Sequence, residues 1–119
     1  MIRAHFEALV RDALDSLPPY FQEKLENVVI VVEEFPSPEV LAQQGIRSPY
    51  GLLGLYHGIP SPLKGRSIYE FPDCITIYQK PIEAQTSTPA AVRQMVAEVV
   101  EHEIGHYFGL NEDELAGLR

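Results

Sequence analysis

The sequence predicts an α+β domain in which about four short strands lie between an N-terminal helix and a longer C-terminal helix. Apolar residues recur at helical spacing near both ends of the chain, and five consecutive β-branched residues follow the first of these segments. Glycine and proline cluster between the expected elements. The 119 residues are about one domain's worth, and no linker, repeat or low-complexity tract divides them. We therefore expect a single domain over residues 1–119, with the last helix packed on one face of the sheet.

The first half of the chain predicts two helical segments and one strand. Residues 3–16 repeat apolar side chains three and four positions apart, which is typical of an amphipathic helix, and two prolines stop the pattern. After a short turn at 22–26, the β-branched run at 28–32 predicts a strand buried on both faces. The segment 35–47 contains prolines and a glycine, so it is expected to be a connection with a short helix at 38–44.

The middle of the chain predicts three more strands. Residues 51–56 form a weaker candidate, whose glycines indicate a sheet edge or a bulge. After a loop rich in glycine and proline, strands at 67–71 and 74–79 are expected to form a hairpin around a Pro-Asp turn. Residues 80–87 are then expected to return over the surface of the protein.

The last element is predicted to be a helix with clear start and stop signals. Thr88 can cap its first turn, and Pro89 suits the first helical position. The pattern continues to Phe108, and Gly109 can end the helix in a left-handed conformation that turns the chain back. The helix carries an apolar stripe of Val92, Met95, Val96 and Val99.

Composition and charge exclude several classes of protein. The 9 basic and 17 acidic residues give a net charge of −8, which disfavours a nucleic-acid-binding protein. No apolar stretch approaches the roughly 18 residues of a membrane span, and the charged N-terminal segment lacks the apolar core of a signal peptide. The single cysteine, Cys74, cannot form an internal disulfide. We therefore expect a cytoplasmic protein that binds neither nucleic acid nor membrane.

The acidic residues are concentrated at the end of the chain. From residue 98 onward there are six acidic side chains, and Arg119 is the one lysine or arginine. The simplest interpretation is a solvated helix face followed by a frayed acidic tail. A metal site would also need carboxylates here, so the bias permits metal binding without indicating it.

The pattern that carries chemistry is His102-Glu103-Ile104-Gly105-His106, of the form H-E-x-x-H. Residues four apart in a helix share a face, so both imidazoles can reach one ion. Glu103 is rotated from the first histidine by roughly 100° and can take a proton from a water molecule at the ion without being a ligand. The apolar stripe is expected to point the same way as the two histidines, so that they continue the buried face. Two histidines packed at a helix end would leave the intervening glutamate unexplained.

Residues 102–112 resemble the zincin metallopeptidase signature in its extended form, H-E-x-x-H-x-x-G-x-x-H/D, which is used by metzincin-like enzymes. They also resemble a family of compact bacterial zincin-like metallopeptidases of about this length, whose motif ends in an acidic residue. The specific match covers about residues 88–115. The resemblance implies a zincin-like fold, a small mixed sheet of about four strands with an N-terminal helix and a C-terminal active-site helix. It also implies that His102 and His106 are zinc ligands and that Glu103 is the general base.

The third ligand differs from the histidine of most metzincins. Glu112 holds the expected place, Asp113 is one residue beyond it, and Glu114 is a remote third choice. The turn after the helix would bring this part of the chain to the metal. A Met-turn is absent, because the only methionines are Met1 and Met95. The usual downstream tyrosine or histidine that stabilises the transition state is missing too.

Three other residues are weaker candidates. His57 lies in a predicted loop and could be an electrophile or a substitute ligand, although an exposed loop histidine is the simpler interpretation. Tyr107 follows the second histidine but is rotated off its face, so we expect it to pack. Cys74 is expected to be a buried, inert thiol in a strand.

We expect a zinc-dependent hydrolase, specifically a minimal metallopeptidase with one zinc ion per chain and a peptide or protein substrate. The substrate would extend along the strand at 51–56 if that strand is the sheet edge, and the acidic surroundings would favour basic substrates. The alternative is a metal-stabilised, zincin-fold binding module without peptidase turnover, which the missing electrophile and the small size favour. A structural protein with an empty site would leave Glu103 as a poorly explained carboxylate beside the core.

Overall fold

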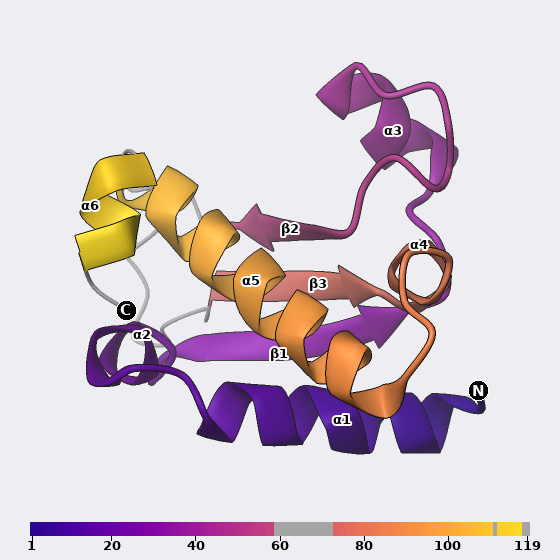
Figure 1. Ribbon diagram of the computed structural model, residues 1–119. Helices are drawn as coiled ribbons and strands as arrows, with labels where there is room; N and C mark the ends of the chain where they lie inside the picture. The colour runs from indigo at the N-terminus through magenta and orange to yellow at the C-terminus, as the bar shows by residue number, and fades with distance from the viewer. Residues whose placement is uncertain (59–72, 111, 118–119) are drawn as a thin grey trace, which may run out of the picture.

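A small sheet with helices packed mainly on one face forms the protein (Figure 1). The computed structural model describes residues 1–58, 73–110 and 112–117, without the side chains of Glu112, Leu115 and Ala116. In chain order the elements are α1 (Arg3–Asp15), α2 (Pro19–Lys24), β1 (Val28–Glu33), α3 (Pro38–Gln44), β2 (Gly54–His57), β3 (Asp73–Tyr78), α4 (Gln79–Glu83), α5 (Pro89–Tyr107) and α6 (Glu112–Gly117). No helix among these residues is long and apolar enough to cross a membrane.

The sheet is mixed, as expected, with strand order β1-β3-β2. β1 pairs with β3 in parallel and β2 pairs with β3 in antiparallel orientation, so among the described residues β3 is central and the other two strands form the edges of the sheet. The predicted strand at 51–56 is confirmed as an edge strand, although it begins at Gly54. Three strands are present in the described part of the chain, and the expected strand at 67–71 lies outside it.

The prediction that residues 28–32 are buried on both faces was wrong. β1 is an edge strand whose residues are half-buried or exposed, and Val29 is 45% exposed. The most buried strand is instead β3, where Ile75 and Ile77 are inaccessible to solvent and the first two residues are half-buried. A run of β-branched residues reports a preference for extended backbone, whereas burial depends on which strands flank it.

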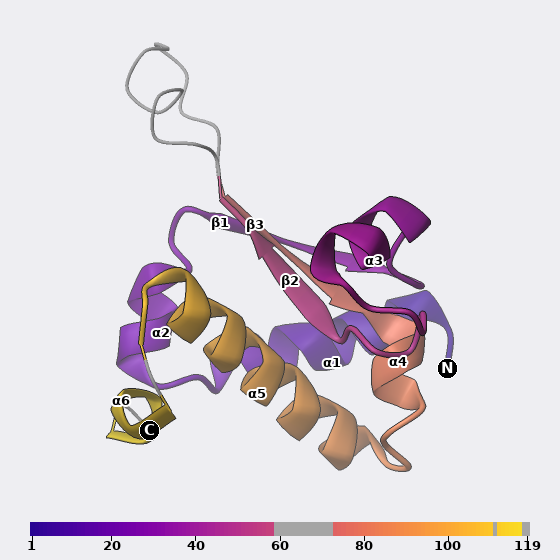
Figure 2. The same cartoon turned by 90° about the horizontal axis from the view of Figure 1, so that it is seen from above.

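The core lies between the sheet and the pair of long helices. Figure 2 shows α1 and α5 on the same side of the sheet, with α3 on the other side. The side chains that fill this layer include Phe6, Leu9 and Val10 of α1, Ile75 and Ile77 of β3, and Val92, Val96, Val100 and Ile104 of α5. This packing fixes the position of α5 over the sheet.

The connection between the sheet and α5 is more structured than expected. Residues 80–87 do not simply return over the surface, because α4 begins directly after β3 and buries Pro81 and Ile82. A helix of five residues is too short to show a hydrophobic period in the sequence. The start of α5 agrees with the prediction, since the Thr88 hydroxyl accepts a hydrogen bond from the Ala91 N–H at 3.1 Å and Pro89 occupies the first turn.

The end of α5 also follows the predicted signal. Gly109 adopts a positive φ of 73°, and its N–H donates to the carbonyl of His106. The next N–H, of Leu110, donates to the carbonyl of Gly105 at 2.7 Å, which completes a Schellman motif. Beyond this turn, residues 112–117 form the short helix α6, where we had expected a frayed tail.

Candidate functional site

The two motif histidines lie on successive turns near the end of α5. The ring centroids of His102 and His106 are 4.1 Å apart, with an angle of 56° between the ring planes. Both side chains are exposed. Two adjacent imidazoles that solvent can reach suit a divalent ion held by nitrogen donors, so this part of the chain fits a zinc site.

The sequence pattern had led us to expect that the histidines would continue the buried face of the helix. In the structure they do not. The fully buried residues of α5 include Val92, Val96, Val100 and Ile104, each four positions after the last. Each step of four residues turns roughly 40° around the helix axis, so the buried stripe drifts around α5. By the last turns it has moved away from the histidines, which therefore face solvent.

The glutamate between the histidines is attached to the edge strand. Oε1 of Glu103 accepts a 3.1 Å hydrogen bond from the backbone N–H of Tyr56 in β2. Gly54 permits the close approach of helix and strand, because a Cβ there would lie 2.6 Å from Cγ1 of Val99 and 3.1 Å from the carbonyl oxygen of Thr76. The sequence identified the glutamate, but its strand partner depends on this tertiary packing.

The side chain of Tyr56 makes two further contacts beside the site. Its ring stacks on Tyr107, with centroids 4.0 Å apart and an interplanar angle of 17°, and its hydroxyl donates to Oδ2 of Asp73 at 3.0 Å. Burial, and then the hydrogen bond and charge of Asp73, raise the pKa of Tyr56 above its ordinary value. The phenol therefore stays protonated. The prediction that Tyr107 packs is consistent with this stack, although the residue is still 42% exposed.

A cleft of about 420 Å³ opens at this point between α5 and β2. Three of its lining residues come from the end of α5: Glu103, His106 and Tyr107. The others come from the end of α3 and from the β2 region: Gln44, Leu52, Leu55 and Tyr56. The cleft thus brings a motif histidine, the motif glutamate and the sheet edge to one place.

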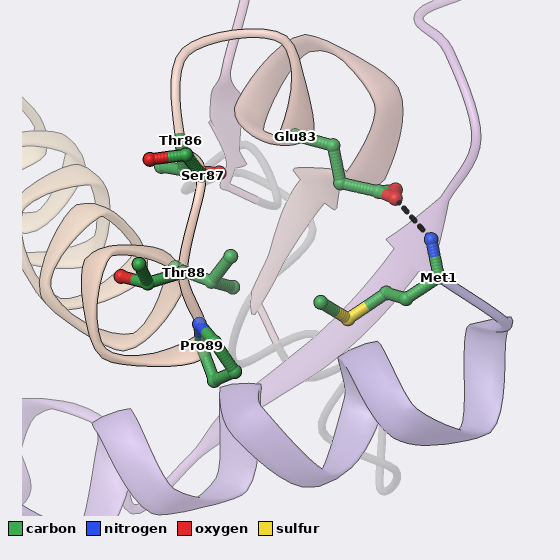
Figure 3. Close-up of a pocket in the computed structure, with 7 residues that line it drawn as sticks. Met1, Glu83, Thr86, Ser87, Thr88 and Pro89 are labelled. Atoms are coloured by element: carbon green, nitrogen blue, oxygen red, sulfur yellow. Dashed lines mark hydrogen bonds and ion pairs between the residues drawn. The ribbon is translucent and has the colours of Figure 1, made fainter.

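A second hollow, of about 210 Å³, lies at the opposite end of α5 (Figure 3). There the N-terminal ammonium of Met1 forms a 2.7 Å ion pair with Glu83, beside the residues that start the helix. None of the candidate site residues lines this hollow. Glu103 and His106 therefore line the cleft at the C-terminal end of α5 and not this second hollow.

His57 and Cys74 lie apart from the motif residues. His57 is the last residue of β2 rather than a loop residue, and it pairs with Cys74 in the antiparallel register. Side chains alternate along a strand, so His57 projects from the face opposite Tyr56, whose ring packs on α5. Cys74 is a free, half-buried thiol and not a fully buried one.

The candidates for the third ligand follow the turn at the end of α5. Glu112 begins α6, but its side chain lies outside the part of the chain that the structure describes. Asp113 and Glu114 are exposed. Within residues 1–58, 73–110 and the described side chains of α6, no three His, Cys, Asp or Glu residues gather closely enough to hold an ion.

The chain is similar to a known protein family. A family model described as a zincin-like metallopeptidase matches residues 25–119. The matched region includes the whole cleft and the H-E-x-x-H motif, and leaves α1 outside. No curated protein is similar enough to this chain to count as a match.

Proposed function

The chain belongs to the zincin-like metallopeptidase family, and from that premise we propose that it is a minimal zinc-dependent peptidase with Glu103 as its general base. The observation that carries the proposal is the hydrogen bond between Glu103 and the edge strand. It holds a carboxylate in a cleft that an adjacent motif histidine also lines. A peptidase needs this combination, because a base must lie within reach of both the nucleophilic water and the substrate backbone.

His102 and His106 would hold the zinc ion, with Glu112 as the proposed third ligand. When bound, zinc supplies a Lewis acid that polarises a carbonyl group and makes water more acidic. Two neighbouring imidazoles and one carboxylate are a donor set that zinc accepts in catalytic sites. The exposure of both imidazoles leaves room for the ion and for a substrate at the end of α5.

Glu103 would move the proton. The backbone N–H of Tyr56 holds one carboxylate oxygen, and the other oxygen can accept a proton from the attacking water. The same carboxyl group would then deliver that proton to the nitrogen of the leaving amine. The hydrogen bond to the strand keeps the carboxylate in the cleft throughout this transfer.

The outer edge of β2, apart from the N–H of Tyr56 that Glu103 holds, would bind the substrate backbone. The carbonyl of Leu53 accepts from the N–H of Tyr78, so this residue and the alternate positions after it face β3. Gly54 and Tyr56 consequently direct their backbone groups to the outer edge, where Glu103 lies. An extended peptide can add to such an edge as a further strand.

A binding module without turnover is the second candidate. The feature that favours it is the hydroxyl of Tyr56, which donates to Asp73 rather than into the cleft. A tyrosine whose hydroxyl already donates its proton to Asp73 does not stabilise a developing oxyanion. Such a module would bind peptides and zinc as the proposed enzyme does, but it would not cleave them.

The test is to measure zinc content and peptide cleavage in the same preparations. We expect about one zinc ion per chain and cleavage of a mixed peptide library, detected by mass spectrometry. Glu103→Gln should keep the zinc and lose about 10²–10⁴-fold in rate. Glu98→Gln is the matched control, because Glu98 is an exposed acid on the same helix that bonds to Gln94. Full activity in Glu103→Gln would exclude this residue as the base.

A further inference from the structure

The two walls of the cleft differ in chemical character. The wall formed by α5 carries Glu103, His106 and Tyr107. The facing residues are two leucines, Leu52 and Leu55, with Gln44 from the end of α3. Figure 2 shows that α3 and α5 lie on opposite sides of the sheet, so the cleft runs along the β2 edge between them.

The direction of the Leu55 side chain follows from the strand register. Leu55 pairs with Thr76, and its neighbour Tyr56 pairs with Ile75 in the core-facing layer. Successive side chains of a strand point to opposite faces. The leucine therefore leaves β2 on the side away from α5, and the half-buried side chain remains partly open to the cleft.

A substrate strand on this edge would alternate in the same way. If one of its side chains points toward α5, the next points toward Leu52 and Leu55. The residue that meets the leucines is thus adjacent in sequence to one that meets Glu103. This places the leucine wall beside the bond that would be cleaved.

Charge does not favour a basic side chain on this wall. The carboxylate that lines the described part of the cleft is that of Glu103, and one of its oxygens is already held by Tyr56. Asp113 and Glu114 are exposed on α6 and do not line the cleft. A charged substrate side chain would lose hydration against leucine, and the described residues of this wall offer no charged group to pair with it, whereas an apolar side chain gains from burial.

We propose that the Leu52–Leu55 wall makes the protein select peptides with an apolar side chain, such as leucine or phenylalanine, next to the scissile bond. This inference rests on the proposed peptidase function and names its substrate class. It replaces the preference for basic substrates that the acidic composition had suggested.

The first measurement is binding in the absence of turnover. Zinc-loaded Glu103→Gln protein is titrated with blocked pentapeptides that are glycine except for a central Leu, Phe, Lys or Glu. We expect the Leu and Phe peptides to bind about tenfold more tightly than the charged ones, which corresponds to partial burial of one apolar side chain. Equal affinities, a preference for Lys, or no binding by any peptide would overturn the proposal.

The second measurement changes the wall itself in the same background. Leu55→Glu should reverse the preference in favour of the Lys peptide, whereas Leu55→Gln should only abolish it. Leu52→Glu is a second version at a position outside the strand, in case a charge within β2 prevents folding. Val29→Glu, on the exposed part of the opposite edge strand, is the control and should leave the preference unchanged. A selectivity that survives both Leu55→Glu and Leu52→Glu would contradict the assignment.

Cleavage assays on the unsubstituted protein test the apolar selectivity separately from the proposed peptidase activity. Cleavage of library peptides without an apolar preference would retain the peptidase and overturn the role of the leucine wall. Apolar-selective binding with no cleavage would overturn the peptidase and support the wall as part of a binding module.

Discussion

The backbone N–H of Tyr56 and the carboxylate of Glu103, 47 residues apart in sequence, are joined by a 3.1 Å hydrogen bond. The donor is a main-chain group, so the position of Glu103 depends on how closely α5 approaches β2. The side chain of Tyr56 acts separately, through its contacts with Tyr107 and Asp73. Changes to the helix–strand distance and changes to the tyrosine side chain should therefore have different consequences.

Gly54→Ala should push α5 away from β2. The added methyl group would lie 2.6 Å from Cγ1 of Val99, a distance that requires movement. We expect a loss of about 1–3 kcal/mol in the free energy of unfolding, measured by urea denaturation. Any hydrolytic activity should fall by more than stability alone explains, because the carboxylate loses its anchor.

A double substitution tests whether this contact is the cause. Val99→Ala removes the methyl groups that collide with the new side chain, so the Gly54→Ala/Val99→Ala protein should be more stable than the sum of the single changes predicts. Strict additivity of the two losses would show that the destabilisation arises elsewhere.

Tyr56→Phe should make stability less sensitive to alkaline pH. Burial and the contact with Asp73 raise the pKa of Tyr56 above the ordinary 10.0, whereas the unfolded chain releases this proton near that value. The unfolded state then binds fewer protons above pH 10, and the stability contributed by the protonated phenol falls as pH rises. The variant lacks this contribution.

At pH 7, we expect Tyr56→Phe to be about 1 kcal/mol less stable, because the bond to Asp73 is lost. The difference in the free energy of unfolding between the unsubstituted protein and Tyr56→Phe should become smaller at about pH 10.5. Urea denaturation at both pH values measures this difference. Tyr50→Phe, at an exposed tyrosine, is the matched control for removal of a phenol. A gap that stays constant with pH would show that the hydrogen bond does not influence the titration of Tyr56.

The elements that sequence predicted well are those specified by neighbouring residues. α5 begins at Thr88 and Pro89 and ends before Gly109 because capping and positive φ are local properties. The burial of β1 was wrong because it depends on strand order, which a run of five residues does not contain. The exposure of the histidines was missed for a related reason, since the buried face of α5 is set by what packs on it.

In the candidate site too, some features are set by neighbouring residues and others by tertiary packing. The spacing of His102, Glu103 and His106 is local and visible in the sequence. Tyr56 and Asp73 were not identified as part of the site, because only the antiparallel pairing of β2 and β3 brings them together. One signal was available: a glycine inside a predicted strand indicates a close approach by another element, and Gly54 is where α5 packs.

Lys24→Met should loosen the attachment of α2 to the end of α5. The ammonium of Lys24 lies 4.8 Å from the ring centroid of Phe108 and 5.3 Å from that of Tyr20. The substitution keeps an apolar stem of similar length and removes the charge, so we expect a loss of about 0.5–1 kcal/mol in the free energy of unfolding. Lys24→Arg should retain most of this stability. Equal losses in the two variants would indicate a packing effect rather than a cation–π contribution.

The proposed third zinc ligand, Glu112, can be tested by mutagenesis of the acidic segment after α5. Gly109 turns the chain back after α5, and α6 begins three residues later at Glu112. Glu112 lies ten residues after His102, the spacing of the extended zincin motif, and its side chain is one methylene longer than that of the competing Asp113. We therefore predict that Glu112 completes the site.

Glu112→Ala should lose zinc under mild chelation, whereas Asp113→Ala and Glu114→Ala should keep it. The three variants each remove one carboxylate from the same acidic segment, so their effects on net charge are identical and only ligation distinguishes them. Zinc content after dialysis against a weak chelator is the measurement, and circular dichroism establishes that the fold persists in the zinc-free state. Loss of zinc from Asp113→Ala, with retention in Glu112→Ala, would move the ligand by one residue and preserve the site. Retention in all three would mean that no carboxylate of this segment is required, because removing one of three protein ligands must weaken the affinity for zinc sharply.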